Sequence, residues 1–183
     1  MFSSGRLRLE ARLDKEAYKN DDIIHVHVTL DNSSNRTVHR LRVAIVQHVH
    51  VCMFTNGRFK NIVGVSETEP GHPVRPGSCL SRVFTIRPGS QLRYPVALAI
   101  EGGLTGPSVR LAPSTVPELV KDKNPYGVTV CYEAKIKAFL GVVDRPVCIR
   151  LPFRLLEDPP VVEEEDPVPL AEEEEEQESV FPT

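Results

Sequence analysis

Hydrophobic and polar residues alternate with a period of two along much of the chain. In residues 6–13 and again in residues 24–30, every second side chain is apolar and the side chains between are mostly polar. This alternation is typical of antiparallel strands that have one face in a core and the other in water. Further β-rich runs occupy residues 37–54, 79–87, 94–101, 126–140 and 147–155, and the run at 126–140 is the clearest.

Turn-forming residues separate these runs. Pro-Gly pairs occur at 70–71, 76–77 and 88–89, and residues 102–125 form a long stretch rich in Gly, Pro and Ser. Seven or eight short strands joined by such turns predict an all-β fold, an immunoglobulin-like antiparallel β-sandwich. No apolar run approaches the roughly 18 residues of a membrane span, and no secretory signal is evident. We therefore expect a cytoplasmic protein.

The composition changes at residue 157. The chain has 183 residues and a net charge of −3, but residues 157–183 contain 12 acidic residues and no Lys or Arg. The first 156 residues then carry 22 basic against 13 acidic side chains. This predicts one folded, basic domain over residues 1–156 and a disordered acidic C-terminal tail over 157–183. The tail could fold back on the basic domain, or it could only improve solubility.

Candidate sites for enzymatic or metal chemistry are few. Two His-x-His pairs, His25/His27 and His48/His50, could hold Zn²⁺ if their strands lay side by side, although such pairs are equally common on solvated strand faces. No nucleophile elbow, phosphate-binding loop or metalloprotease motif is present, so we expect no enzyme and no catalytic residue. The basic residues are not interleaved with aromatics, which argues against nucleic-acid binding. The four cysteines, without a Cys-x-x-Cys pair, are expected to be free thiols that pack like small hydrophobic residues within strands.

The most coherent charged feature is a cluster of four cations. Arg40 and Arg42 share one strand face, and Arg58 and Lys60 share a face of the following run. If the two runs pair around a turn at residues 55–57, the four cations form one patch that can hold a phosphorylated head group. A solvated strand face is the alternative interpretation.

Several segments together resemble the C-terminal domain of arrestins. LEARLDKEAY at 9–18, VHVTLDNSSNRTV at 26–38, Gln47, the segment 52–54 and LPFRL at 151–155 are similar to LEASLDKE, a VxVTNN turn, RQYADICLF and ELPF, in the same order. The resemblance covers roughly residues 7–158. It implies a β-sandwich with a flexible acidic tail, and a non-enzymatic protein that binds phosphorylated G-protein-coupled receptors and recruits endocytic adaptors.

The resemblance also suggests a ligand site and a membrane contact. Three bases of the family's inositol-phosphate site match Arg42, Val46 and Lys60, so two cations are retained and we expect weak binding of an inositol phosphate or phosphoinositide. No cofactor and no metal are implied. Glu101 matches an acid of the family's polar core, whose second acid appears here as Ser108. Leu140, Val142 and Val143 resemble a hairpin at the edge of the domain that makes a peripheral membrane contact.

Other family motifs are incomplete. Phe181 matches the first half of an adaptor-binding tail segment and would be the tail anchor, but the second Phe and the Arg that follow it in the family are missing. No clathrin-binding box is found, so endocytic adaptors stay possible partners only. Receptor engagement would need an N-domain supplied elsewhere, and recruitment to the plasma membrane would follow from it. The alternative function is a receptor-independent trafficking scaffold, alpha-arrestin-like or retromer-like; the PPxY motif typical of alpha-arrestins is absent.

Overall fold

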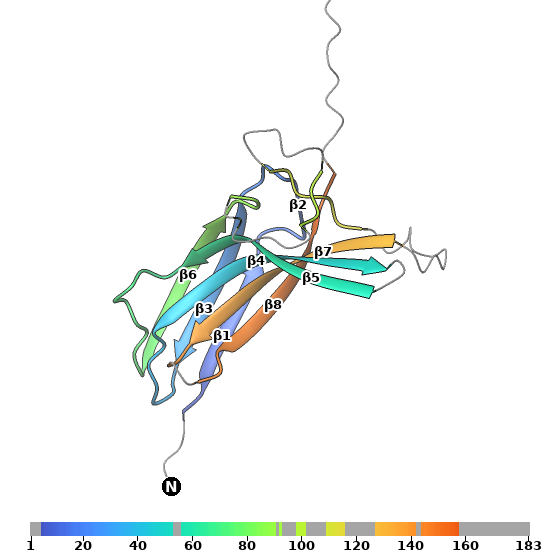
Figure 1. The fold of residues 1–183 in the computed structure, drawn as a ribbon. Coiled ribbons are helices and arrows are strands. Elements are labelled where there is room, and N and C mark those ends of the chain that lie inside the picture. Colours follow the sequence, from blue (N-terminus) through green and yellow to red (C-terminus); the bar gives the residue numbers. More distant parts are fainter. Residues whose placement is uncertain are drawn as a thin grey trace, which may run out of the picture.

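The computed structural model describes residues 5–52, 56–90, 92, 98–101, 109–115, 127–141 and 144–157. Within these residues the regular structure consists of strands (Figure 1). They are β1 Leu7–Leu13, β2 Ala17–Tyr18, β3 Ile24–Asn32, β4 Arg40–Cys52, β5 Asn56–Glu67, β6 Ser78–Ile86, β7 Gly127–Phe139 and β8 Val147–Leu155. The described part of the chain contains no helix of the length and hydrophobicity that crossing a bilayer requires.

The strands form two sheets that pack face to face, which confirms the predicted β-sandwich. One sheet has the order β1-β3-β6, and the other has the order β2-β8-β7-β4-β5. Neighbouring strands are antiparallel except β2, which runs parallel to β8 over two residues. The ends of β4, β5 and β7 extend beyond the three-stranded sheet as a projecting arm (Figure 1).

Two sequence predictions need correction. Of the run expected at 94–101, residues 94–97 lie outside the described residues, and residues 98–101 make only one bridge, from Ile100 to Leu111. The expected turn at 55–57 begins outside the described residues, but Asn56 and Gly57 already belong to β5. The pairing of β4 with β5 is as predicted, and β5 begins one residue after the start of the expected turn.

The core lies between the inward faces of the two sheets. The alternate residues Ile24, Val26, Val28 and Leu30 of β3 are each at most 1% exposed. From the other sheet, Phe153 packs edge-on against Tyr18, with 5.4 Å between the ring centroids. The ring centroid of Tyr132 lies 5.8 Å from that of Phe153. Burial of such side chains stabilises the fold by roughly 1.5–3 kcal/mol each, so the alternation seen in the sequence is the main source of stability.

A buried polar network attaches two non-strand segments to the inner face of the larger sheet. Gln47 is fully buried; its amide nitrogen donates to Ala99 O at 2.7 Å and to Tyr132 Oη at 2.8 Å, and its oxygen accepts from Ala99 N at 3.0 Å. Tyr132 donates in turn to Ala112 O. Asn20 bonds both the N–H and the C=O of Leu111. These bonds hold residues 98–101 and 109–115 over the inner sheet face.

A bulge in β5 changes which of its residues face outward. Ile45 pairs with Gly64 but Val46 pairs with Ile62, so Val63 is an extra residue in β5. One extra residue reverses the alternation, which places Glu67 on the same outer face as Lys60. A side chain at Gly64 would begin 2.6 Å from Ile86 Cγ2, so glycine is required for β5 to approach β6 this closely.

Candidate anion-binding site

Basic residues meet across neighbouring strands on the outer face of the larger sheet. Arg42 of β4 lies directly opposite Lys137 of β7, and Lys135 of β7 lies directly opposite Arg150 of β8. Like charges placed opposite each other destabilise a sheet by up to roughly 1 kcal/mol a pair. Because two such pairs lie side by side, positive charge is concentrated on this face, and this clustering does not help the domain to fold.

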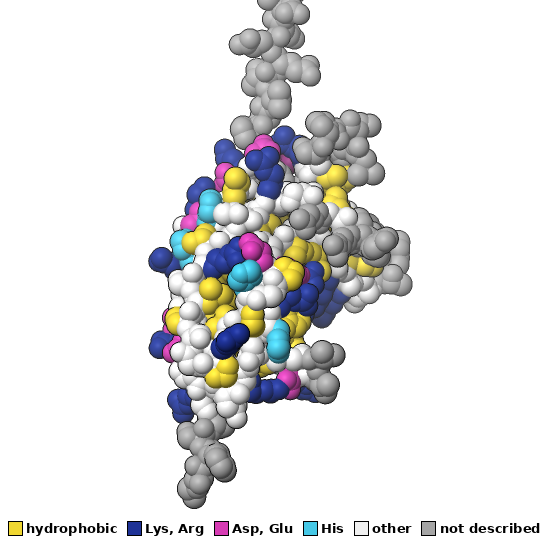
Figure 2. All heavy atoms as spheres, turned by 90° about the vertical axis from the view of Figure 1, so that its left-hand side faces the viewer, with side chains coloured by type: hydrophobic (Ala, Val, Ile, Leu, Met, Phe, Trp, Pro, Cys, Tyr) yellow, Lys and Arg dark blue, Asp and Glu magenta, His cyan; other side chains and the backbone are white. Residues whose placement is uncertain are grey.

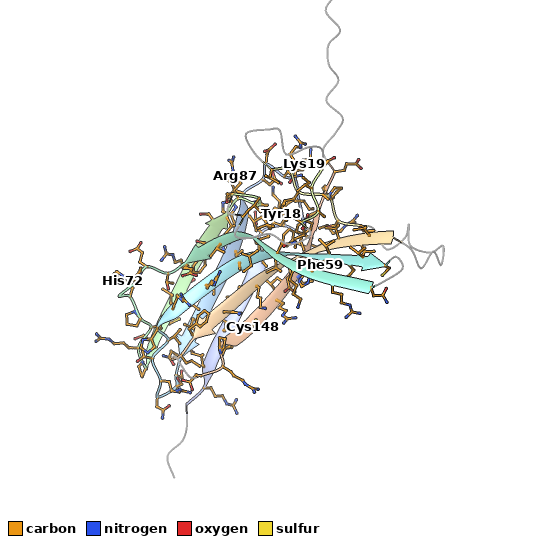
Figure 3. All side chains as sticks on the ribbon, viewed as in Figure 1. Tyr18, Lys19, Phe59, His72, Arg87 and Cys148 are labelled. Atoms are coloured by element: carbon orange, nitrogen blue, oxygen red, sulfur yellow. The ribbon has the colours of Figure 1, made fainter. Side chains whose placement is uncertain are left out.

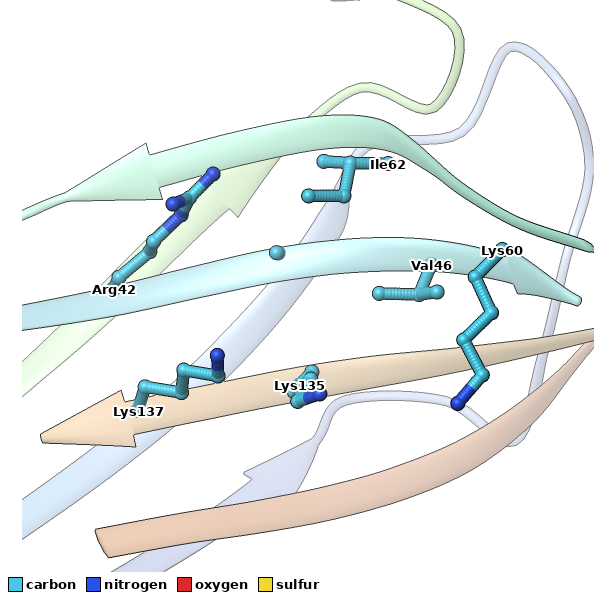
Figure 4. Close-up of a pocket in the computed structure, with 7 residues that line it drawn as sticks. Arg42, Val46, Lys60, Ile62, Lys135 and Lys137 are labelled. Atoms are coloured by element: carbon cyan, nitrogen blue, oxygen red, sulfur yellow. The ribbon is translucent and has the colours of Figure 1, made fainter. Parts of the chain in front are cut away.

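Four of these outer-face cations surround a shallow pocket with an apolar floor. Its cavity volume is about 240 Å³. The cations come from three strands of the larger sheet, and the floor from two (Figure 4). The lining residues are Arg42, Lys60, Lys135 and Lys137 at the rim and Ala44, Val46 and Ile62 in the floor. Ile62 lies two residues after Lys60 and before the bulge, so it faces the same side as Lys60, and it is 38% exposed.

The pocket cations are only partly neutralised. Arg42 Nε lies 3.2 Å from Glu67 Oε1, but without the alignment of a hydrogen bond. Among the described residues, no acid lies within ion-pair distance of Lys60, Lys135 or Lys137. The pocket thus offers three free ammonium groups and one guanidinium group to an anion, and phosphate oxygens are strong acceptors for such donors.

The predicted cluster of four cations is divided by the structure. Arg42 and Lys60 line the same pocket, as expected from the sequence. Arg40 instead stacks on the ring of Phe139 at 4.4 Å and pairs with Glu67 at 3.4 Å, and Arg58 lies on the arm opposite His50. The expectation of one patch of four was therefore wrong for Arg40 and Arg58, because they lie at opposite ends of a long hairpin.

Lys135 and Lys137 were missed from the sequence. Their alternation on the polar side of the run 126–140 was visible, but it did not show which strand lies beside β7. Only the pairing of β4 with β7, about 90 residues apart, brings them to Arg42. Positive charge alone could not have found them, since Lys and Arg are spread over much of the surface shown in Figure 2.

The two His-x-His pairs do not form a metal site. His25 and His27 lie on β3 of the smaller sheet, whereas His48 and His50 lie on the outer face of β4 in the larger sheet. No cluster of potential metal ligands occurs in the described ranges. The sandwich separates the pairs, so the four-nitrogen arrangement that the sequence left possible is not formed. His72 lies in the connection between β5 and β6 (Figure 3).

The four cysteines are free thiols, as predicted, but they are exposed instead of packed like core residues. Cys131 faces outward beside Glu133. The pKa of its thiol is raised, mainly because the sulfur is partly shielded from water and also because the negative charge of Glu133 lies nearby. Cys148 lies on the outer side of β8 (Figure 3). An outward position on a strand explains why strand-forming sequence did not mean burial.

The remaining candidates suggested by the resemblance are only partly described. Glu101 donates its N–H to Arg110 O, and its Oε2 is buried without a hydrogen-bond partner among the described residues. Leu140 is half-buried against the core, and Asp144 next to the hairpin is ion-paired with Arg36. The other three candidates, Val142, Val143 and Phe181, lie outside the described residues.

A buried tyrosine fixes the end of β1 away from the pocket. Tyr18 Oη donates to Asp14 Oδ1 at 2.6 Å, and the N–H of His25 donates to the same oxygen at 3.1 Å. Burial alone would raise the pKa of Asp14, but these hydrogen bonds lower it overall. Burial and this carboxylate raise the pKa of Tyr18 far above its usual range. We assign Tyr18 and Asp14 a structural role, because the hydrogen bond between them fixes the position of both side chains.

Comparison with known proteins connects this geometry to one family. Residues 3–160 match the family model described as "Arrestin (or S-antigen), C-terminal domain". The chain is 37% identical over 161 residues to beta-arrestin arr-1 of Caenorhabditis elegans, which covers 87% of this chain and 37% of that protein. It is 34% identical to phosrestin-2 of Drosophila melanogaster over 87% of this chain and 44% of that protein. It is also 34% identical to the lateral-eye arrestin of Limulus polyphemus, over 88% of this chain and 40% of that protein. The chain spans less than half the length of these relatives.

Proposed function

This chain belongs to the arrestin family, of which it carries the C-terminal domain, and on that premise we propose that it is a non-enzymatic binding module in the regulation of G-protein-coupled receptors. It works in the cytoplasm and is recruited to the plasma membrane, where it takes part in desensitisation and endocytic trafficking. The pocket of Arg42, Lys60, Lys135 and Lys137 binds an anionic lipid head group or an inositol phosphate. G-protein-coupled receptors and endocytic adaptors are its further partners.

The observation that supports this ligand class is the pair of like-charge contacts. Arg42 lies opposite Lys137, and Lys135 lies opposite Arg150. Glu67 and Glu133 lie beside the two arginines, so among the described residues it is the two lysines that have no acidic partner. The phosphates of an inositol polyphosphate or phosphoinositide head group would supply that partner and offset the repulsion between the cations. The clustered cations of the described outer face should therefore be more stable when they contact a multiply phosphorylated ligand than when they face only solvent.

The pocket also explains why the binding should be weak. Where the family's site has its middle base, this chain has Val46, 6% exposed. Glu133 lies opposite Val46 on β7, so a phosphate placed there meets an apolar surface and a carboxylate. Affinity then depends on the cations at the two ends of the pocket.

Titration of inositol hexakisphosphate by calorimetry tests the proposal directly. Replacement of Lys135 and Lys137 by Gln removes two positive charges and leaves uncharged polar side chains that are one atom shorter. Each charge-assisted contact contributes roughly 1.5–3 kcal/mol, so the double variant should bind at least about tenfold more weakly. Raised salt should weaken the wild type as well, since screening acts on exposed charges.

The matched control replaces Arg8 and Arg12 of β1 by Gln. These cations are exposed on the smaller sheet, so the control removes the same charge from another surface. It should bind like the wild type. Equal weakening of both double variants would reduce the pocket to general surface charge and refute the site. Binding of membrane cargo without dependence on receptor phosphorylation would favour the trafficking scaffold.

A further inference from the structure

The outer-face histidines continue the row of cations away from the pocket. His48 lies directly opposite Lys60, and His50 lies directly opposite Arg58, both on β5. The pocket and these residues form one cationic stripe across four strands. The stripe consists of Arg42, Lys137, Lys135, Arg150, Lys60, His48, His50 and Arg58.

We propose that this cationic stripe docks on an anionic bilayer surface and that docking strengthens as His48 and His50 take up protons. The inference rests on the proposed function for the pocket, and it adds a larger contact surface and a regulation by pH. Among the residues that the structure describes, neither histidine belongs to a cluster of potential metal ligands, and the two His-x-His pairs lie in different sheets.

The dimensions of the stripe favour a membrane over a single soluble ligand. From Arg42 to His50 is eight residues of strand, roughly 27 Å at strand rise, and four neighbouring strands span roughly 14 Å. A soluble inositol phosphate fills only the pocket end. An extended phosphopeptide would follow one line, whereas the cations occupy two dimensions. An array of anionic head groups matches both directions.

The groups around the two histidines define how protonation acts. The side chains around His48 are Lys60 of β5, Cys131 and Glu133 of β7, and Arg150 of β8. The side chains around His50 are Arg58 of β5 and Thr129 of β7. His48 Nε2 is 3.1 Å from Glu133 Oε1, and Arg150 Nε is 4.0 Å from the same oxygen. A proton on His48 therefore balances the one carboxylate that the described residues place in the middle of the stripe.

Protonation and docking then support each other by linkage. In the free protein an imidazolium at His50 faces the permanent cation Arg58, whereas one at His48 faces both Lys60 and the carboxylate of Glu133. An anionic surface offsets the repulsion from these cations, so it favours the protonated form of the stripe. By reciprocity, a fall in pH strengthens docking, and histidine is the side chain that changes charge between about pH 5 and 8.

Vesicle co-sedimentation of the full chain at about pH 7.5 and about pH 5.5, at constant salt, tests this proposal. The probe is phosphatidylcholine with phosphatidylglycerol, whose phosphodiester keeps its charge over this range. A basic group near such a surface contributes on the order of a fivefold gain, so the wild type should bind roughly twentyfold more tightly at the lower pH. His48→Gln with His50→Gln should keep the binding at the higher pH and lose most of the gain.

His25→Gln with His27→Gln is the matched control, because it removes the same motif from the other sheet. It should show the same gain as the wild type, and both variants keep the acidic residues of 157–183, which also titrate. Binding that is equal at both pH values overturns the histidine proposal and leaves the pocket proposal standing. A gain that persists in the His48/His50 variant does the same, whereas no binding at either pH by the wild type overturns the docking proposal, and the calorimetric titration of inositol hexakisphosphate then decides the pocket proposal separately.

Discussion

Replacement of Gln47 by Leu tests whether the buried polar network holds the inner-face segments in place. Leu has a similar size, so the change removes hydrogen bonds without leaving a large cavity. Two backbone groups lose their partner, the N–H and the C=O of Ala99, which are bonded to Gln47 at 3.0 and 2.7 Å. Tyr132 still donates to Ala112, so its hydroxyl stays satisfied.

The expected loss follows from these two orphaned groups. Each buried group left without a partner costs roughly 1–3 kcal/mol, and Ala99 is only half-buried, so water relieves part of that cost. We expect the free energy of unfolding to fall by about 2–3 kcal/mol, or roughly 5–10 °C in Tm for a domain of this size. Urea denaturation gives the energy, and hydrogen exchange at the Ala99 amide should become much faster.

His50→Leu is the control for this prediction, because it adds the same residue to the same strand on the outward face. Its stability should stay within about 0.5 kcal/mol of the wild type. A Gln47→Leu variant that unfolds like this control, or that keeps the slow exchange of Ala99, would show that the segments are held by other contacts. The reasoning from buried hydrogen bonds would then be refuted.

Four other changes test separate parts of the structure. Lys137→Glu turns a repulsion with Arg42 into an attraction, so urea denaturation should show about 0.5–1 kcal/mol more stability while calorimetry shows weaker binding of inositol hexakisphosphate. Val46→Arg should strengthen that binding about tenfold, and unchanged affinity would contradict the pocket. Asp14 has a lowered pKa, so Asp14→Asn should cost about 1 kcal/mol at neutral pH, a difference that shrinks as pH falls below about 4. Deletion of 157–183 should tighten binding to anionic vesicles if the tail competes for the cations; unchanged binding would argue against competition.

The inward faces of the strands could be predicted from the sequence because they depend on local alternation. Residues 24–30 alternate in the sequence and are buried alternately in the structure. The bulge at Val63 could not be predicted in this way, since one extra residue reverses the alternation of β5 beyond it. Glu67 reaches the side of Arg42 only through that reversal.

The candidate site shows more clearly which contacts could not be predicted from the sequence. Arg42 and Lys60 were accessible to sequence reasoning because they lie on strands that follow each other in the chain and pair. Lys135 joins them through a pairing between distant segments, and nothing in its own neighbourhood specifies that partner. Gln47 was noticed within a motif, but its role depends on Ala99 and Tyr132, which come from two other parts of the chain.

The two faces of β4 carry different tasks, and this division explains how the domain tolerates an unfavourable outer surface. Inward residues such as Ile45 and Gln47 are fully buried, so they supply apolar burial and satisfied hydrogen bonds. Outward residues such as Arg42 and His48 each have a cation and a carboxylate as neighbours, so their net contribution to stability is small beside that of the core. Because the side chains alternate, substitutions on one face leave the packing of the other intact. Outer-face variants should therefore change binding without unfolding the domain, and this separation is what makes the binding experiments interpretable.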